Sequence, residues 1–443
     1  MEFSHLPEEN RKNIILVTSR ELNLQEQVVE KDWWVTKTLQ ALFSLPISDL
    51  ISFKGGTSLS KCWNKIKRMS EDIDVGLDRS LFGMSGNLTK NQIKDTLRRK
   101  SCAFVRDELP SLLAERFKTF GLDENQYDIY VNRTSVSTVD PETVYIAYKS
   151  LFEPNQYVES EVKIEVSSRS MEGPTATVPI KSFIDKTFKD EEFSSKDFSV
   201  NAVLPHRTFL EKIFLLHEEF SRGEDKIRTE RMSRHPFDIY MLSQTPIAYQ
   251  ALSNKALYEA IIAHRKTFIM LGGMNYDSLQ TETLNIIPPD SVMNKWREDY
   301  KTMRETMIYD KAPDFDEIIS RLKDINVKVN QIKYKKDVPD PACLMNKSQK
   351  LQGKEQETVG YAIEYATEKG MHTGIKWLQD SFNELFQISK DEFSIADVFD
   401  TSYKNALFKE IIDKCSLNIT VQQLKKLNEI ANDLGGQGGG RGV

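Results

Sequence analysis

The segment "FKGGTSLSKCWNKIKRMSEDIDVGLD", residues 53–78, constrains the fold more than any other part of this chain. A short apolar run, "LISF", leads directly into Gly55 and Gly56, and a helix-like pattern follows the glycine pair. Asp72 and Asp74 then stand two residues apart in a stretch with strand-like alternation. Side chains two apart on a strand point to the same face of a sheet. The segment therefore predicts a strand–turn–helix–strand unit that places two carboxylates beside a glycine turn.

The paired carboxylates predict a metal site. Two clustered carboxylates repel each other unless a cation lies between them. Mg²⁺ is the natural cation, because it prefers oxygen ligands and is often shared with substrate phosphates. A third carboxylate would allow two metal ions, as phosphoryl and nucleotidyl transfer often requires. Glu165 is our candidate, on the polar face of the predicted strand "YVESEVKIEVS", but Glu159 and Glu161 share that face and the sequence alone does not choose between them.

The glycine turn predicts a phosphate site. Gly55 and Gly56 carry no side chain, so the backbone can approach a ligand closely. The helix start that follows offers unpaired N–H groups and a positive dipole end to an anion. Thr57 and Ser58 add hydroxyl donors there. We expect the turn to bind phosphates and the aspartate pair to bind the metal that bridges them; the spacing does not fit the P-loop pattern GxxxxGK[ST].

The length and composition indicate a globular protein with more than one domain. A chain of 443 residues is too long for one ordinary core. No apolar run reaches the roughly 18 residues of a spanning helix, and no secretory signal is visible, so we expect no membrane partner. The four cysteines are scattered and form no CxxC, which favours a reducing, cytoplasmic location. The formal net charge of −6 argues against a general nucleic-acid coat, but a local basic groove stays open.

The order of predicted elements indicates an α+β fold. Helices are expected in residues 7–44 and 90–117, and strands at "YDIYVNRT", "TVYIAYKSLF" and "YVESEVKIEVS". From about residue 206 the chain reads as mainly helical. We predict four parts: a mixed domain at 1–205, a helical domain at 206–334, a helical module of unknown role at 335–434, and a flexible glycine-rich tail at 435–443.

Several motifs together resemble a known family. "FKGGTSLSK" followed by "RMSEDIDVGLD" resembles the nucleotidyltransferase-like toxins of the AbiE type, found in type IV toxin–antitoxin and phage-defence (abortive infection) systems. Further matches are "VVEKDWWVTKTLQALF", "VKIEVSSRS", "PHRTFLEKIFLLHEEF", "RMSRHPFDIYML" and "PPDSVMNKWREDYKTMRETMIY". The resemblance covers roughly residues 1–312 and implies a fold like the catalytic domain of DNA polymerase beta. It makes 1–205 a nucleotidyltransferase domain with a small mixed sheet and 206–334 a helical domain that completes the cleft.

The resemblance also implies an activity. It implies Mg²⁺-dependent transfer of a nucleoside monophosphate from an NTP, with two ions expected. Some relatives modify the acceptor end of tRNA and others bind GTP, so GTP and CTP are candidate nucleotides and an RNA such as tRNA is the candidate acceptor. A separately encoded antitoxin is the expected partner.

The site residues implied by the resemblance come from four motifs. They are Gly55, Gly56, Thr57, Ser58 and Lys61 in the phosphate turn, Ser70, Asp72 and Asp74 in the metal motif, Lys212 in the first helical motif, and Arg234 and Asp238 in the second. Lys212 is expected near the triphosphate, and Arg234 can meet phosphate through two hydrogen bonds. Asp238 is expected to position or deprotonate the acceptor hydroxyl. His235 stands where many relatives have an aspartate, and we expect a structural role for it.

Other interpretations remain open from the sequence. The chain is alternatively a nucleotide-binding interaction module with little or no turnover that blocks a host process, or a kinase-like enzyme that passes on a terminal phosphate. Trp33 and Trp34 fit a core or an interface better than a base-stacking platform. A basic cluster around the motif either guides an RNA backbone or forms a solvated helix face; it comprises Lys54, Lys61, Lys65, Lys67 and Arg68.

Overall fold

A seven-stranded mixed sheet forms the centre of the first half of the protein. The computed structural model describes residues 2–70, 72–132, 143–153, 158–308 and 311–334. The strands are β1 (Ile51–Lys54), β2 (Asp72–Leu77), β3 (Tyr127–Asn132), β4 (Thr143–Tyr148), β5 (Glu161–Ser167), β6 (Thr175–Ile180) and β7 (Phe198–Val203). Their order is β3-β4-β5-β2-β1-β7-β6. Strand β2 is antiparallel to β1 and parallel to β5, so the predicted α+β fold with a small mixed sheet is confirmed.

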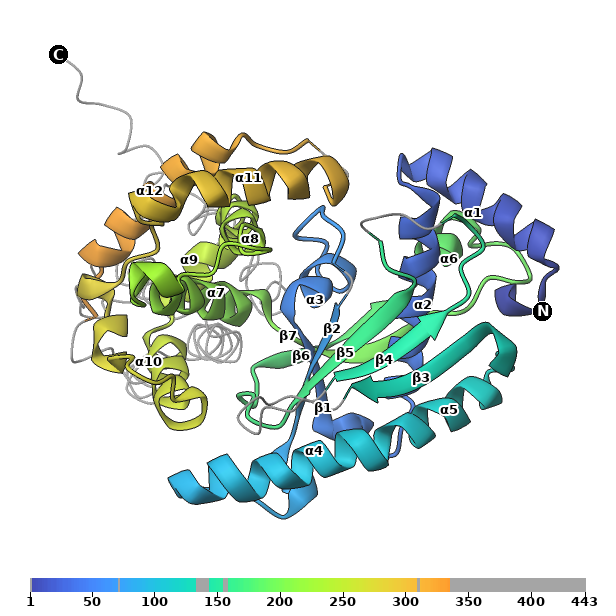
Figure 1. Ribbon diagram of the computed structural model, residues 1–443, viewed down its shortest axis with the longest axis horizontal. Coiled ribbons are helices and arrows are strands. Elements are labelled where there is room, and N and C mark those ends of the chain that lie inside the picture. Colours follow the sequence, from blue (N-terminus) through green and yellow to red (C-terminus); the bar gives the residue numbers. More distant parts are fainter. Residues whose placement is uncertain (1, 71, 133–142, 154–157, 309–310, 335–443) are drawn as a thin grey trace, which may run out of the picture.

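The first half also contains the helices that cover the sheet (Figure 1). They are α1 (Glu8–Leu22), α2 (Glu26–Leu42), α3 (Gly55–Lys61), α4 (Arg98–Asp107), α5 (Leu109–Thr119) and α6 (Phe183–Thr187), with a π-helical turn, Gln92–Leu97, before α4. Trp33 and Trp34 on α2 are each 4% exposed, and the Trp34 ring stacks on Tyr148 of β4 with centroids 5.0 Å apart. These tryptophans therefore belong to the core, as the sequence indicated.

The second half is helical and has a hydrophobic core of its own, on the left in Figure 1. Its helices are α7 (Pro205–Phe220), α8 (Arg234–Ser243), α9 (Pro246–Ser253), α10 (Lys255–His264), α11 (Asp290–Thr306) and α12 (Phe315–Gln331). Leu59 of α3 and Ile66 of the following loop are fully buried in this core. The loop between α3 and β2 is therefore held by the helical half, although its two flanking elements belong to the sheet half.

The structure departs from the sequence prediction in two respects. Helix α3 begins at Gly55 itself, not after the glycine pair. Strands β6 and β7 were not predicted, because "TATVPI" and "FSVNAV" mix polar residues and a proline into short runs. The predicted parts 335–434 and 435–443 lie outside the described residues. Within the described ranges, no helix is both long and apolar enough to cross a membrane.

The packing of α2 gives a stability prediction. Replacing Trp34 with alanine removes a buried ring that contacts Trp33, Phe117, Tyr127 and Tyr148. We expect the free energy of unfolding to fall by about 3–5 kcal/mol, because the cavity left behind cannot be refilled. Urea denaturation measures this loss. Val17→Ala is the control, since that side chain is 47% exposed and should change stability by less than about 0.5 kcal/mol.

Candidate active site

A cavity of about 370 Å³ lies between the central strands β1, β2 and β5 and the helices α7, α8 and α10. Its basic lining residues are Lys54, Arg68, Arg169, Arg207, Lys212, Arg228, Arg234 and Arg265, and its acidic ones are Asp72, Asp74, Glu165 and Glu211. Several of these cations pair with carboxylates: Arg68 and Lys212 with Asp238, Arg228 with Glu219, Arg265 with Glu218 and Arg207 with Glu211. We call this space the catalytic cavity, after the role proposed for it below. It brings cationic and anionic side chains together around one hollow.

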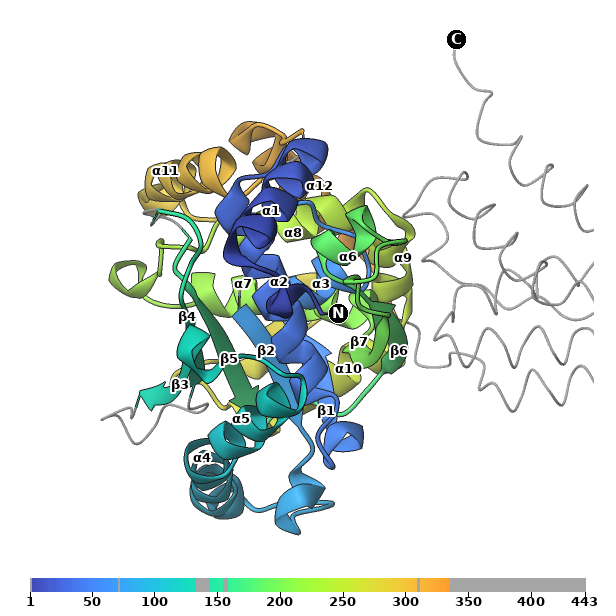
Figure 2. The same cartoon turned by 90° about the vertical axis from the view of Figure 1, so that its right-hand side faces the viewer.

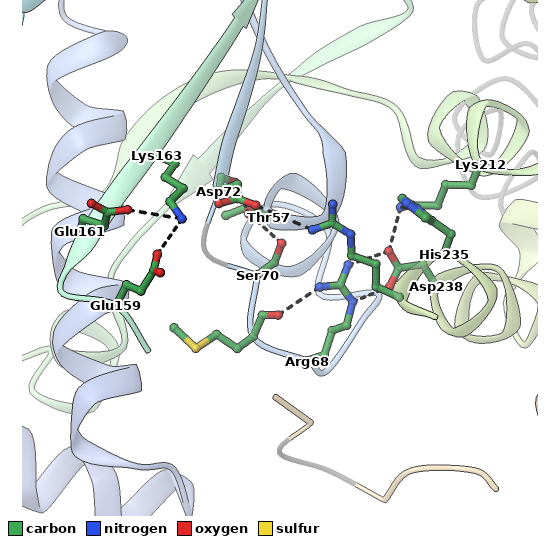
Figure 3. Close-up of polar contacts among 12 residues, drawn as sticks. Thr57, Arg68, Ser70, Asp72, Glu159, Glu161, Lys163, Lys212, His235 and Asp238 are labelled. Atoms are coloured by element: carbon green, nitrogen blue, oxygen red, sulfur yellow. Dashed lines mark hydrogen bonds and ion pairs between the residues drawn. The ribbon is translucent and has the colours of Figure 1, made fainter. Parts of the chain in front are cut away.

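Strand register selects the third carboxylate. Strands β2 and β5 run in parallel with Asp74 directly opposite Glu165. Glu161 instead accepts a hydrogen bond from the Tyr130 hydroxyl at 2.9 Å, and Glu159 pairs with Lys163 at 2.6 Å (Figure 3). Of the three glutamates that the sequence left open, Glu165 is the one placed beside the aspartate pair.

The three carboxylates influence one another. Desolvation in the cavity raises the pKa of Glu165, and the negative charges of Asp74 and Asp72 raise it further. Lys54 and Arg234 oppose this shift, and the Arg234 Nη1 lies 3.7 Å from Asp72 Oδ2. Among the described residues, no group of three or more His, Cys, Asp or Glu side chains is placed so that it could hold a metal ion. The donor set is nevertheless of the kind that suits Mg²⁺, which usually takes one or two carboxylates and completes its shell with water and phosphate.

The two glycines are needed for close approach of side chains. Gly55 has a φ of +78°, and a Cβ there would lie 2.0 Å from Asp74 Oδ2. A Cβ on Gly56 would lie 2.7 Å from Arg68 Nη2 and 2.8 Å from Ser70 Oγ. Both glycines and Ser70 line the catalytic cavity, and their predicted binding of phosphate stays a prediction. The structure adds a second reason for the pair: any larger residue would displace Asp74 or Arg68.

The side chains of Thr57, Ser58 and Lys61 do not fit their predicted contact with phosphate. Because α3 begins at Gly55, Thr57 and Ser58 are part of the helix, and each is only 1% exposed. The Thr57 hydroxyl donates to the Asp72 carbonyl oxygen at 2.5 Å and lies 2.9 Å from Ser70 Oγ (Figure 3). Lys61 points to the other side of α3, where its ammonium pairs with Asp32 at 2.5 Å. Thr57 therefore links α3 to β2, and Lys61 links α3 to α2.

Arg68 is the main residue that sequence reasoning misjudged. Its guanidinium binds the Asp238 carboxylate through two bonds, of 2.7 Å from Nε and 2.8 Å from Nη2 (Figure 3). Lys212 Nζ lies 2.8 Å from Asp238 Oδ2. Arg68, Asp238 and Lys212 are only 3%, 0% and 7% exposed. Neither a solvated face nor an RNA-guiding surface is correct for Arg68, and the only sequence signal for its role was its position two residues before Ser70.

This buried group changes the role expected for Asp238. Burial alone would raise the pKa of its carboxyl group, but Arg68 and Lys212 together lower that pKa well below its ordinary value. Both oxygens are occupied by cations, so the predicted deprotonation of an acceptor hydroxyl does not fit this geometry. Asp238 instead holds the Lys212 ammonium at the wall of the cavity.

His235 completes the group as a neutral side chain. Burial lowers its pKa well below the usual value, and the charges of Lys212 and Arg234 lower it further. Its Nδ1 lies 3.5 Å from Lys212 Nζ (Figure 3). The histidine adds no negative charge beside the lysine. The structural role expected from the sequence agrees with this placement.

Comparison with known proteins identifies the family. The family model described as "Nucleotidyl transferase AbiEii toxin, Type IV TA system" matches residues 38–321, well over half of the chain. The chain belongs to the AbiEii nucleotidyltransferase toxin family. This AbiEii protein is thus a nucleotidyltransferase toxin of the type IV toxin–antitoxin class, and the match spans both the sheet half and the helical half.

Solved structures and curated sequences add little to this assignment. The nucleotidyltransferase toxin MenT4 from Mycobacterium tuberculosis is similar over 82% of this AbiEii chain and 98% of its own, with 13% sequence identity and a TM-score of 0.42. None of the curated proteins compared with the chain matches it.

The buried ion pair gives the second prediction. Asp238→Asn keeps the shape of the side chain but leaves Arg68 and Lys212 without a buried counter-charge. We expect a loss of about 3–5 kcal/mol in the free energy of unfolding at pH 7. Because the folded-state pKa of Asp238 is lowered, its stabilisation is complete above the ordinary aspartate pKa of 3.8 and is lost as the pH falls below it.

Chemical denaturation at several pH values measures this difference. The gap between the wild-type and Asp238→Asn proteins should be largest near neutral pH and shrink in acid. Asp324→Asn on the exposed face of α12 is the matched control. Equal stability of Asp238→Asn and wild type at pH 7 would contradict the assigned role.

Proposed function

We propose that this toxin transfers a nucleoside monophosphate from an NTP to an RNA acceptor such as the 3′ end of tRNA, with Mg²⁺. One observation supports this most: the cavity combines three neighbouring carboxylates with eight cationic side chains around a glycine turn. Transfer from an NTP needs both features, because metal-binding carboxylates and cations for the triphosphate must lie within the length of one nucleotide.

The cationic wall is the proposed site of the triphosphate. Lys212 and Arg234 reach the cavity from α7 and α8, and Lys54 reaches it from the end of β1. Lys212 is held in place by its 2.8 Å contact with Asp238. An ammonium fixed in this way stabilises charge that develops on the phosphates without first having to reorganise.

The carboxylates are the proposed metal ligands. Asp72, Asp74 and Glu165 would hold Mg²⁺, which when bound neutralises phosphate charge and aligns the reacting oxygens. Desolvation is the larger cause of the raised pKa of Glu165, and the charges of Asp74 and Asp72 add to it. A cation among the three carboxylates would relieve that second contribution. Two ions remain the expected number.

The chain's own residues then act mainly by positioning. Arg68 fixes Asp238, Asp238 fixes Lys212, and Thr57 holds Asp72 through its carbonyl oxygen. In-line attack on the α-phosphate needs this rigidity more than it needs a strong base. We therefore assign no side chain here as general base for the acceptor hydroxyl.

The remaining identities follow from the family. GTP and CTP are the candidate nucleotides, and the reaction would take place in the cytoplasm, where nucleotides and tRNA are available. Growth arrest would follow from the modified acceptor, and a separately encoded antitoxin would counter it. A role in phage defence fits the same scheme.

Asp72 on β2 gives the third prediction. Asp72→Asn should lower transfer by at least about a thousandfold, because one carboxylate of the proposed metal site is lost while its shape is kept. The assay incubates the purified protein with Mg²⁺, each α-labelled NTP in turn, and either total tRNA or cell protein. Asp128→Asn on the exposed edge strand β3 is the control and should keep full activity.

The outcomes of this assay separate the alternatives. Label on tRNA in the wild type, absent with Asp72→Asn, supports the proposed reaction and names the nucleotide. Label on protein would replace RNA as the acceptor. Transfer from a γ-labelled NTP instead would favour the kinase-like alternative, and unchanged transfer by Asp72→Asn would contradict the assigned metal role.

Metal removal gives a fourth prediction. Mg²⁺ together with a non-hydrolysable NTP analogue should raise the thermal midpoint of the wild-type protein, since binding to the folded state stabilises it. EDTA should reverse the rise. Asp72→Asn should show a much smaller rise, and the same rise in both proteins would place the metal elsewhere.

A further inference from the structure

The catalytic cavity has two ends that differ in chemistry. Helices α8 and α10 lie on opposite sides of α7 in Figures 1 and 2, and both contribute to the cavity wall. On the α8 side, the Arg234 guanidinium approaches the Asp72 carboxylate at 3.7 Å. On the α10 side, the lining residues include the apolar Ile261 and Ile269. The cavity therefore extends from the carboxylates toward an end with apolar side chains, which we call the α10 end.

Two serines lie one strand step beyond the carboxylates. Ser167 follows Glu165 by two residues on β5, so it lies on the same face, about 6.6 Å further along the strand. Its partner on β2 is Gly76. A Cβ on Gly76 would lie 2.9 Å from the Ser170 Cβ, so Ser170 packs directly onto β2 at this position. Both serines line the cavity, and within the described ranges neither hydroxyl has a hydrogen-bond partner.

The arginines at the α10 end are already engaged. Arg207 pairs with Glu211 at 2.9 Å. Arg265 pairs with Glu218, and Arg169 has an interaction of its own as well. Among the described residues of this end, the groups left for a ligand are therefore the apolar side chains and the two serine hydroxyls.

A stacked group fixes the wall of the α10 end. The ring of His264, which lines the cavity, stacks on the Phe268 ring with centroids 5.0 Å apart and planes inclined by 19°. The Arg79 guanidinium lies 4.3 Å from the centre of the Phe268 ring and pairs with Glu172 at 2.9 Å. Arg79 thus joins the chain after β5 to the turn after α10. Burial lowers the pKa of His264 to about 4, so its ring adds no charge to the wall at pH 7.

We propose that the α10 end binds the nucleobase of the NTP and that Ser167 and Ser170 form hydrogen bonds to its polar edge. The inference rests on the proposed function and specifies how that site selects its nucleotide. The proposed metal ligands set the place of the phosphates, so the nucleoside extends away from them. A base is flat, uncharged and carries a few hydrogen-bonding atoms. Pockets for such groups combine apolar walls with a small number of placed polar groups, which is the combination found at the α10 end.

The first test fills the proposed base pocket. Ser167→Leu adds a branched side chain at a half-buried position of the wall. The probes are non-hydrolysable analogues of the four NTPs and inorganic triphosphate, each titrated with Mg²⁺. We expect the Kd of the best-bound analogue to rise by at least about tenfold, while the Kd of inorganic triphosphate stays within about twofold of wild type. Ser199→Leu, at an exposed position of β7, is the matched control and should change neither value.

The second test removes the hydroxyls and keeps the space. In Ser167→Ala with Ser170→Ala, we expect the ratio of Kd between the second-best and the best analogue to fall by about tenfold, because hydrogen bonds to the preferred base are lost. Ser199→Ala with Ser320→Ala alters two exposed serines on β7 and α12 and should keep the wild-type ratio. This pair of variants decides the matter even if Ser167→Leu does not fold.

Three results would overturn the inference. These are equal Kd values of the wild type for all four analogues, an unchanged ratio in Ser167→Ala/Ser170→Ala, and a loss of inorganic triphosphate binding in folded Ser167→Leu as large as its loss of analogue binding. Failure of the proposed function is a different observation, namely that the wild type binds an analogue but transfers label from none of the four NTPs.

Discussion

The buried pair of Arg68 and Asp238 is the interaction on which the rest of the site depends. Neither charge is stable alone in the interior, where removing one partner leaves the other uncompensated. Arg68 comes from the loop that precedes β2, and Asp238 comes from helix α8. Their two hydrogen bonds therefore fix the loop of one half against the helices of the other. The position of Lys212 follows, since it binds the same carboxylate, and so does the need for glycine at position 56, where the guanidinium leaves no room for a Cβ.

The site places three mutually repelling carboxylates beside a group of basic side chains. Asp72, Asp74 and Glu165 lie together on neighbouring strands, and Arg234 approaches Asp72 at 3.7 Å. Mutual repulsion among these carboxylates costs stability, and the metal of the proposed reaction would relieve it. This cost is tolerated because two separate hydrophobic cores, one in the sheet half and one in the helical half, stabilise the fold. The charged residues of the site lie between these two cores.

Local patterns predicted the parts of the site that are local. The aspartate pair on a strand and the mainly helical chain after residue 205 follow from spacing within one element, and both are where the sequence placed them. The glycine pair was expected before the helix, but it forms the first turn of α3. The sequence did not decide between Glu165, Glu159 and Glu161, because that decision depends on the register between β2 and β5, which lie about 90 residues apart in the chain. Thr57 and Ser58 were misplaced because a helix that begins on the first glycine turns them inward. Arg68 and Asp238 are 170 positions apart, so no periodicity connects them, and a basic residue in a lysine-rich stretch is more often at the surface.

The neutral His235 has a consequence for the charge of the cavity wall. Arg68 and Lys212 contribute two positive charges, Asp238 contributes one negative charge, and the histidine contributes none because its pKa is well below the usual value. The group therefore carries a net charge of one positive unit, and Arg68, Lys212 and His235 all line the cavity. An aspartate at position 235 would cancel that charge and leave Lys212 shared between two carboxylates. The neutral histidine thus leaves Asp238 as the carboxylate that Lys212 binds, and it preserves the positive charge that the proposed triphosphate site needs.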